Sequence, residues 1–211
     1  MLILSEPRRA APLLIAALFC IGAESSPATE TAMEVLGRYP PKIIQKLHAK
    51  NLVRLPGTQD GSLYIGALVL FDQPLGHVLH LLSQTERQSE FLPELKRVKT
   101  IRRDDASVID EHQVRVLFIR LDYRLRTEFD LKAARIHWKL DPSHDNDLAL
   151  LEGYWELYEL GESRTLGIFG TRVVLSSALP TFIQRAVTRR NVSRVVEQMR
   201  LWVNSNGSYR P

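Results

Sequence analysis

Residues 179–203 read LPTFIQRAVTRRNVSRVVEQMRLWV, and this stretch decides the fold. Its apolar residues recur at helical spacing, at Phe182, Ile183, Ala186, Val187, Val192, Val195, Val196, Met199, Trp202 and Val203. Pro180 suits a first helical turn, and Asn206-Gly207 is a stop signal after the last apolar residue. The sequence therefore predicts one long amphipathic helix over residues 180–203.

The residues before this helix alternate apolar and polar side chains, which is typical of strands with one dry face and one wet face. In residues 114–130, predicted as one strand, the apolar face carries Leu117, Ile119, Leu121, Tyr123 and Leu125, and the polar face carries Arg120, Asp122, Arg124 and Arg126. The strands that follow, at residues 135–140, 152–158 and 165–173, alternate in the same way. This pattern predicts an antiparallel sheet.

Further elements are expected earlier in the chain. Residues 63–71 predict the first strand, residues 97–102 predict an edge or outer strand, and residues 108–110 extend the sheet. Two short helices are expected between them, over residues 74–82 and 85–95, the second with Thr85 as its N-cap. A sheet that is followed by one long apolar helix often wraps around that helix, and the space between them can hold a ligand.

Composition sets broad limits on function. The chain has 211 residues, 45% hydrophobic and 25% charged, as expected for a soluble globular protein of one domain with extensions. The formal net charge of +4 is too small to indicate a partner by itself. No aromatic residues interleave the basic ones as a platform for single-stranded nucleic acid requires, so no nucleic-acid partner is expected.

The N-terminus predicts export. Arg8 and Arg9 precede an apolar run over residues 10–23, and a polar stretch follows, so residues 1–23 read as a signal peptide for the periplasm. An uncleaved membrane anchor is the alternative, and lipidation at Cys20 is disfavoured by Phe19 before it. Cys20 is the only cysteine, so an exported chain would lack disulfides, thiol catalysis and cysteine-bound metal. Residues 24–60 read as a linker (24–33) and a small basic helical extension, and residues 61–205 as the main domain.

The chain resembles the START-like (SRPBCC) superfamily, in particular its polyketide cyclase/dehydrase and coenzyme Q-binding-protein branch. The stretches that carry the resemblance are ALVLFDQP (67–74), FLPEL (91–95), GYWEL (153–157) and Leu179-Pro180. The resemblance covers residues 63–205 and implies an α+β helix-grip fold: a curved antiparallel β-sheet wrapped around a long C-terminal α-helix, with two short helices after the first strand. Members mostly bind or carry lipids, quinones, sterols or polyketides, and some act as cyclases.

This fold predicts an apolar ligand cavity between the sheet and the last helix. The candidate lining residues are Leu121, Tyr123, Trp138, Trp155, Phe169, Phe182 and Ala186. We therefore expect the protein to bind a hydrophobic small molecule or lipid as a carrier or presenter, with no cofactor. A cyclase or aromatase working in the same cavity is one alternative, favoured by a buried His, Tyr or carboxylate in the lining. A protein-interaction module using the basic helix face is another, favoured by a filled core.

Catalytic and metal motifs are weak throughout. Ser176-Ser177 lacks the Gly-x-Ser-x-Gly turn that exposes a nucleophile. His77 and His80 lie three residues apart on a predicted helix, but no third ligand follows at a clear spacing. Residues 141–152 have the ligand spacing of a calcium loop, yet Asn146 stands where a Gly is needed, which favours a polar hairpin loop. Neither a catalytic residue nor a metal site is predicted.

Basic residues form two groups that would suit anionic lipid head groups. One group flanks a predicted strand at Lys96, Arg97, Lys99, Arg102 and Arg103, and the other lies on the last helix at Arg185, Arg189, Arg190 and Arg194. A solvated basic surface explains both equally simply. An anionic membrane surface is therefore an alternative partner, and oligomeric state is not predicted.

Overall fold

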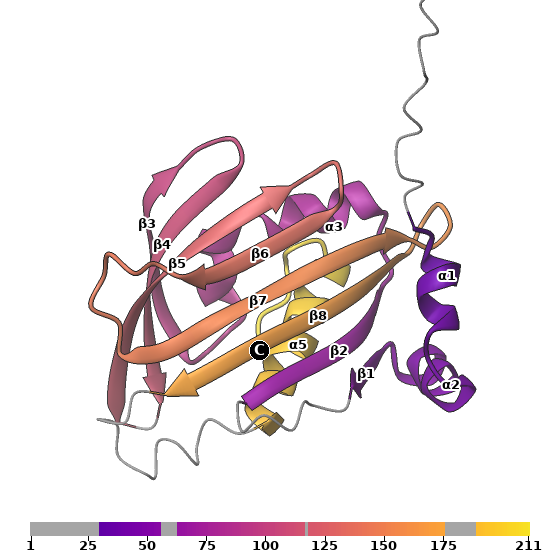
Figure 1. Cartoon of the computed structure of the whole chain (residues 1–211), viewed down its shortest axis with the longest axis horizontal. Coiled ribbons are helices and arrows are strands. Elements are labelled where there is room, and N and C mark those ends of the chain that lie inside the picture. Colours follow the sequence, from indigo (N-terminus) through magenta and orange to yellow (C-terminus); the bar gives the residue numbers. More distant parts are fainter. Residues whose placement is uncertain (1–29, 56–62, 117, 176–188) are drawn as a thin grey trace, which may run out of the picture.

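The computed structural model describes residues 30–55, 63–116, 118–175 and 189–211. Within these residues one antiparallel sheet of eight strands runs in the order β1-β2-β8-β7-β6-β5-β4-β3 and curves around the C-terminal helix α5 (Figure 1). The strands are β1 Leu52–Leu55, β2 Leu63–Phe71, β3 Leu95–Arg103, β4 Ser107–Val116, β5 Ile119–Asp130, β6 Arg135–Leu140, β7 Leu148–Glu159 and β8 Thr165–Leu175. The described helices are α1 Ala32–Gly37, α2 Pro41–Lys50, α3 Leu75–Leu82, the 3-10 helix η1 Thr85–Glu90, and α5 Arg189–Asn204.

The inner face of the sheet, which we define as the face toward α5, packs against α3, η1 and α5. The largest fully buried side chains of this core include Phe71, Phe91 and Trp202. The rings of Phe91 and Trp202 stack with centroids 4.7 Å apart, which joins the end of η1 to α5. Alternation along each strand supplies this core, because every second side chain of a strand points to the same face.

The outer face of the sheet has a second core, formed with α1 and α2. Its buried members are Ala32, Val35, Leu36, Leu47, Val53, Leu68, Leu70, Leu166 and Ile168. Helix α1 begins with a capping box, in which the Thr31 hydroxyl accepts from the Glu34 amide and the Glu34 carboxylate accepts from the Thr31 amide. The segment predicted as a linker up to residue 33 is thus already helical at Ala32, and Leu52–Leu55 add an edge strand that was not predicted.

Two predicted elements differ from the structure. Residues 114–130 are two strands joined by a hairpin, because Val116 pairs with Ile119 across a two-residue loop. That loop contains no Gly, Pro or Asn, so no turn residue marks the hairpin, although the inward side changes from even-numbered residues on β4 to odd-numbered residues on β5. The second short helix is the 3-10 turn η1, and Thr85 does not cap it, because its hydroxyl donates to Asp110 instead.

The described part of the long last helix agrees with the prediction from Arg189 to its end at Asn204. Asn206 and Gly207 both have positive φ, and the Gly207 amide donates to the Trp202 carbonyl at 2.8 Å, which closes the helix as the stop signal predicted. Pro180, Phe182 and Ala186 lie outside the described residues.

Residues 1–29 also lie outside the described part of the chain, so the signal peptide stays a prediction. In the described part, no helix is both long enough and apolar enough to span a membrane.

Candidate functional site

An inner cavity of about 290 Å³ lies between the inner face of the sheet, the helices α3 and η1, and α5. Most of its wall is apolar. The sheet contributes Leu121, Leu125, Ile136, Trp155, Phe169 and Val173, and the helices contribute Leu81, Leu82, Met199 and Trp202. The volume is near the lower end of the usual range for small-molecule sites, about 300–1,000 Å³.

Three aromatic rings form a continuous wall on β6, β7 and β8. Trp155 and Phe169 are cross-strand partners with ring centroids 4.9 Å apart, and Trp138 lies 5.7 Å from Phe169. Gly153 makes room for this wall, because a Cβ there would lie 2.3 Å from Cζ2 of Trp138 and 2.5 Å from the Gly170 carbonyl oxygen. The absence of a side chain at Gly153 therefore leaves room for the Trp138 ring beside β7.

One end of the inner cavity is polar. His112 on β4 and Tyr123 on β5 are cross-strand partners, and their rings stack with centroids 5.2 Å apart and planes 13° apart. Both side chains line the cavity. Two hydrogen-bonding rings are thus presented together at the end of an apolar chamber.

A buried carboxylate lies next to His112 on the same face of β4. Asp110 is 1% exposed and accepts two short hydrogen bonds, at 2.5 Å from the Thr85 hydroxyl and at 2.6 Å from the Thr100 hydroxyl. These bonds link β3, β4 and η1 behind the polar end. Because a buried carboxylate is costly unless it is hydrogen-bonded, the two threonines stabilise Asp110 and hold η1 against the sheet.

Burial keeps both cavity rings uncharged at neutral pH. It lowers the pKa of His112 to about 4, although the nearby Asp110 carboxylate opposes that shift. Burial also raises the pKa of the Tyr123 phenol, and Tyr123 retains some accessible surface only because it faces the cavity. The phenol can therefore donate a hydrogen bond to a ligand oxygen, and the neutral imidazole can accept or donate one.

The structure brings together five of the residues predicted to line a cavity, namely Leu121, Tyr123, Trp138, Trp155 and Phe169. Phe182 and Ala186 lie outside the described residues. The binding role of all seven stays a prediction.

Sequence reasoning missed His112 and Asp110. Their signal was present, since residues 108, 110, 112 and 114 continue the inward alternation of β4, with two polar side chains at buried positions.

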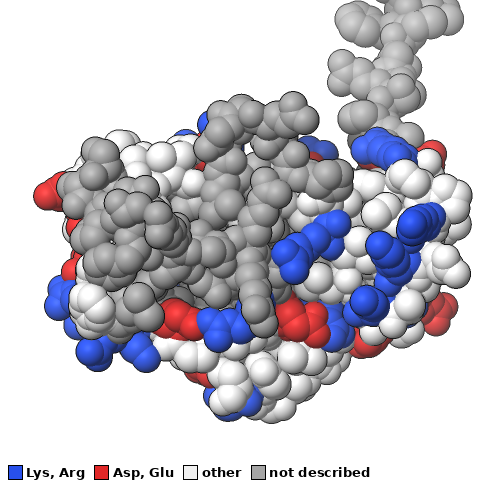
Figure 2. Space-filling view, turned by 90° about the horizontal axis from the view of Figure 1, so that it is seen from below, with Lys and Arg blue, Asp and Glu red and all other residues white. Residues whose placement is uncertain are grey.

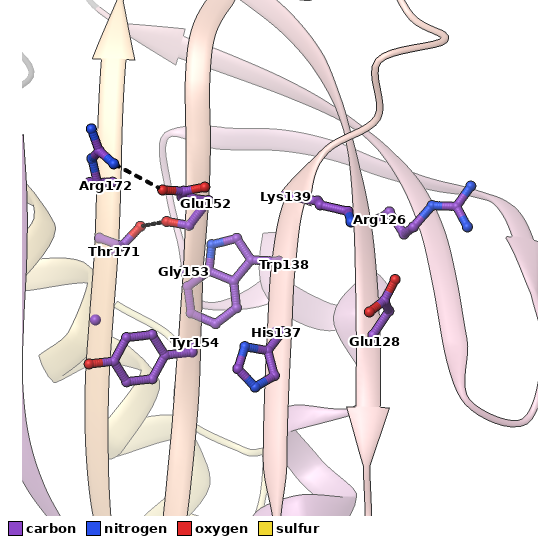
Figure 3. Close-up of a pocket in the computed structure, with 11 residues that line it drawn as sticks. Arg126, Glu128, His137, Trp138, Lys139, Glu152, Gly153, Tyr154, Thr171 and Arg172 are labelled. Carbon is purple, nitrogen blue, oxygen red and sulfur yellow. Dashed lines mark hydrogen bonds and ion pairs between the residues drawn. The ribbon is translucent and has the colours of Figure 1, made fainter.

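A second hollow, the outer groove, has about 390 Å³ and lies on the opposite face of β5 to β8 (Figure 3). Its side chains are mostly charged, and Arg172 approaches Glu152 at 3.5 Å. The ring of Tyr154 lies over Gly170, where a Cβ would be 2.5 Å from the ring. The groove is more open than the inner cavity and its wall offers much less apolar surface to a ligand, so we assign the site to the inner cavity.

Metal-binding geometry is absent from the described residues, where no three His, Cys, Asp or Glu side chains gather. The Nε2 of His80 lies 2.9 Å from the side-chain nitrogen of Gln84, so that imidazole contacts its own helix end. The Asp141 carboxylate accepts from the amide and hydroxyl of Ser143, which fits a polar hairpin loop.

Comparison with known proteins adds a family and a fold. A family model described as polyketide cyclase / dehydrase and lipid transport matches residues 72–200. No curated protein sequence matches the chain.

Several solved structures share the fold. An aromatase/cyclase from Streptomyces has 14% identity and a TM-score of 0.58, with 67% of this chain and 93% of that chain covered. A START superfamily protein from Mycobacterium smegmatis has 13% identity and a TM-score of 0.56, with 69% and 99% covered. A STAR-related lipid transfer protein from Xanthomonas axonopodis has 8% identity and a TM-score of 0.59, with 73% and 99% covered. At these identities the likeness shows the fold alone, and it confirms the α+β helix-grip arrangement.

Proposed function

This chain belongs to the polyketide cyclase / dehydrase and lipid transport family, and we propose that it binds one hydrophobic small molecule in the inner cavity, as a carrier or presenter. The observation that carries the proposal is the cavity itself, a largely apolar chamber with the stacked rings of His112 and Tyr123 in its wall. Lipids, quinones, sterols and polyketide-like molecules all have this division between an apolar body and a few oxygen atoms.

Burial of an apolar ligand body supplies the driving force. Each methylene group moved from water into the cavity stabilises the complex by about 0.8 kcal/mol. The neutral rings of His112 and Tyr123 then orient the ligand through its carbonyl or hydroxyl group. Binding of this kind requires no cofactor and no catalytic group.

An enzyme of the aromatase or cyclase class is the second candidate, and His112 is the observation that favours it. A general base works best when its pKa lies near the working pH. The pKa of His112 is lowered to about 4, and burial moves the pKa of Tyr123 away from neutrality in the opposite direction. Both shifts favour hydrogen bonding over proton transfer, so binding remains the primary proposal.

A matched pair of variants on β8 tests the ligand site. Val173 lines the inner cavity, whereas its neighbour Val174 is 37% exposed on the other side of the strand. In a fluorescence titration with N-phenyl-1-naphthylamine, Val173→Trp should weaken binding on the order of tenfold, because the ring occupies ligand space. Val174→Trp should bind as the wild type does. Equal binding by both variants and the wild type would refute the cavity as the site.

Export remains part of the proposed function, supported by the charged, apolar and polar regions of residues 1–28. Fractionation of cells that express the full chain should place it in the periplasm or the membrane. A chain that lacks residues 1–23 should stay in the cytoplasm, and its export would contradict the signal assignment.

A further inference from the structure

Helix α2 carries a row of three lysines, which we call the lysine row: Lys42, Lys46 and Lys50. Their spacing of four residues places them on one side of the helix, and all three are exposed. Away from the lysines, α2 packs against the second core on the outer face of the sheet through Leu47, Ile43 and Ile44. In Figure 2 the right side of the molecule, where α1 and α2 lie in Figure 1, shows Lys and Arg side chains with fewer acidic ones.

The lysine row lacks the ion pairs found around most other cations. The arginines of η1, the sheet and α5 are largely paired, as in Arg87–Glu90, Arg103–Glu86, Arg124–Glu111, Arg164–Asp72, Arg194–Glu94 and Arg200–Glu197. Among the described residues no carboxylate pairs with Lys42, Lys46 or Lys50, and the sequence has no Asp or Glu between Glu34 and Asp60. The row is therefore uncompensated positive charge.

This arrangement is unfavourable for α2 by itself. Like charges four residues apart on a helix repel each other, and the row contains two such pairs in succession. An anionic surface laid along the helix would remove that repulsion and attract all three ammonium groups together. On β3, Arg102 and Arg103 are paired with acidic neighbours and Lys99 lies across the sheet from Glu111, so acidic groups lie among those cations. On α5, Arg194 is paired with Glu94. The lysine row has no such acidic neighbours within residues 35–59.

The chain that precedes α1 favours a membrane as the anionic surface that the lysine row binds. The apolar run ends at Ala23, seven residues before Glu30, where the described structure begins. Seven extended residues span at most about 25 Å. Both roles proposed for that run, as a signal or as an anchor, would bring a membrane next to the unit that carries the lysine row.

We propose that the lysine row binds the anionic head groups of a phospholipid membrane and holds the outer face of the sheet toward the bilayer. This inference does not depend on the ligand of the inner cavity. Each lysine near a charged membrane strengthens binding by a factor of about five. Loss of all three should therefore weaken binding on the order of 100-fold.

Vesicle co-sedimentation of the full chain tests the proposal. Wild type is compared with the triple variant Lys42→Gln, Lys46→Gln, Lys50→Gln on phosphatidylcholine vesicles with and without 30 mol% phosphatidylglycerol. The matched control, Lys96→Gln, Arg97→Gln, Lys99→Gln, removes the same charge from the exposed side of β3. Circular dichroism and thermal melts check that both variants remain folded, since all six positions are exposed.

The expected result is binding that requires phosphatidylglycerol, falls with added salt, and is lost in the α2 variant alone. Equal loss in the β3 variant would overturn the proposal, as would wild-type binding that does not depend on phosphatidylglycerol or salt. A duplex DNA that binds more tightly than the vesicles through the same lysines would also overturn it and would assign the row to nucleic acid.

Discussion

The two faces of the sheet are built from the same strands but present opposite chemistry. The inner face buries apolar residues and two neutral rings around a cavity, and its buried carboxylate, Asp110, is held by two hydroxyl groups. The outer face is covered at one end by α1 and α2 and is otherwise charged. Because neighbouring residues of a strand point to opposite faces, one sequence specifies both surfaces at once.

The two faces are also formed by different parts of the chain. The family match covers residues 72–200 and therefore includes most of the inner cavity, whereas α1, α2 and β1 lie before it. The N-terminal unit adds its own small core and its own row of cations to the outer face. The family match thus bears on the inner face, and the unit of α1, α2 and β1 on the outer face lies outside the matched residues.

Removing the main aromatic contact of the inner core should have the largest effect. Trp202 is 1% exposed, stacks on Phe91, and lies under the Arg87 guanidinium at 5.1 Å. Trp202→Ala should lower the free energy of unfolding by about 3–5 kcal/mol, measured by urea denaturation. Val174→Ala, on an exposed site of β8, should cost less than about 0.5 kcal/mol. Similar costs for the two variants would show that α5 is not anchored to the inner face.

The buried imidazole should make the stability of the inner face depend on pH. The pKa of His112 is lowered to about 4 in the folded protein, from about 6.5 when unfolded. As pH falls from 6.5 toward 4, the unfolded chain binds a proton that the folded chain does not, so stability is lost. Relative to His112→Gln, wild type should lose about 3 kcal/mol over this window.

Urea denaturation at pH 7 and pH 4.5 measures this difference. The variant keeps its hydrogen-bonding capacity but does not titrate, so the neighbouring Asp110 carboxylate affects both proteins. A pH dependence that is the same in wild type and variant would contradict the buried, neutral state of His112.

Glycine substitutions compare the faces directly. A Cβ at Gly153 on the inner face would meet both the Trp138 ring and a backbone carbonyl, whereas a Cβ at Gly170 on the outer face would meet the Tyr154 ring. Both Gly153→Ala and Gly170→Ala should destabilise by about 1–3 kcal/mol, with the larger cost at Gly153, because backbone yields less than a side chain. A Cβ at Gly76 in α3 would have no atom within 4 Å, so Gly76→Ala should be neutral or stabilising. Thermal melts of the three variants measure these differences.

The smallest effect is expected at the start of the outer-face unit. Thr31→Ala removes the side-chain half of the capping box of α1 and should cost about 1 kcal/mol. Hydrogen exchange should localise the loss to α1 and its contacts, with little change in α3 or α5. Thr31→Ser is the matched control and should retain the cap. Global loss of protection in Thr31→Ala would show that the two faces are more strongly coupled than their separate cores suggest.

Much of the inner face could be predicted because alternation is a strong signal on a half-buried sheet. Tyr123, Trp138, Trp155 and Phe169 were placed on the inward side by period two alone, and all four line the inner cavity. The hairpin between β4 and β5 was missed because its two-residue loop carries no turn residue. The only signal was the change of the inward side from even-numbered residues on β4 to odd-numbered residues on β5.

Other features escaped sequence reasoning because they depend on contacts between distant segments. Asp110 acquires its role from Thr85 and Thr100, which lie on other elements. The α1 helix had a visible signal in the Thr31-x-x-Glu34 capping box, but the polar residues before it resembled a linker. The lysine row was visible as a basic segment, but the acidic neighbours of the other basic groups, such as Glu86 beside Arg103 and Glu94 beside Arg194, appear only in the structure.

Native mass spectrometry of the full chain, purified from its own host in gentle buffer, tests the central claim most directly. We predict a protein species that carries one additional small molecule, released on activation as a neutral or lipid-like mass, and less occupied in Val173→Trp than in the wild type. A wild-type chain that is empty, and that also fails to take up lipid, sterol and quinone probes added in excess, would contradict the assignment of the inner cavity as a binding site.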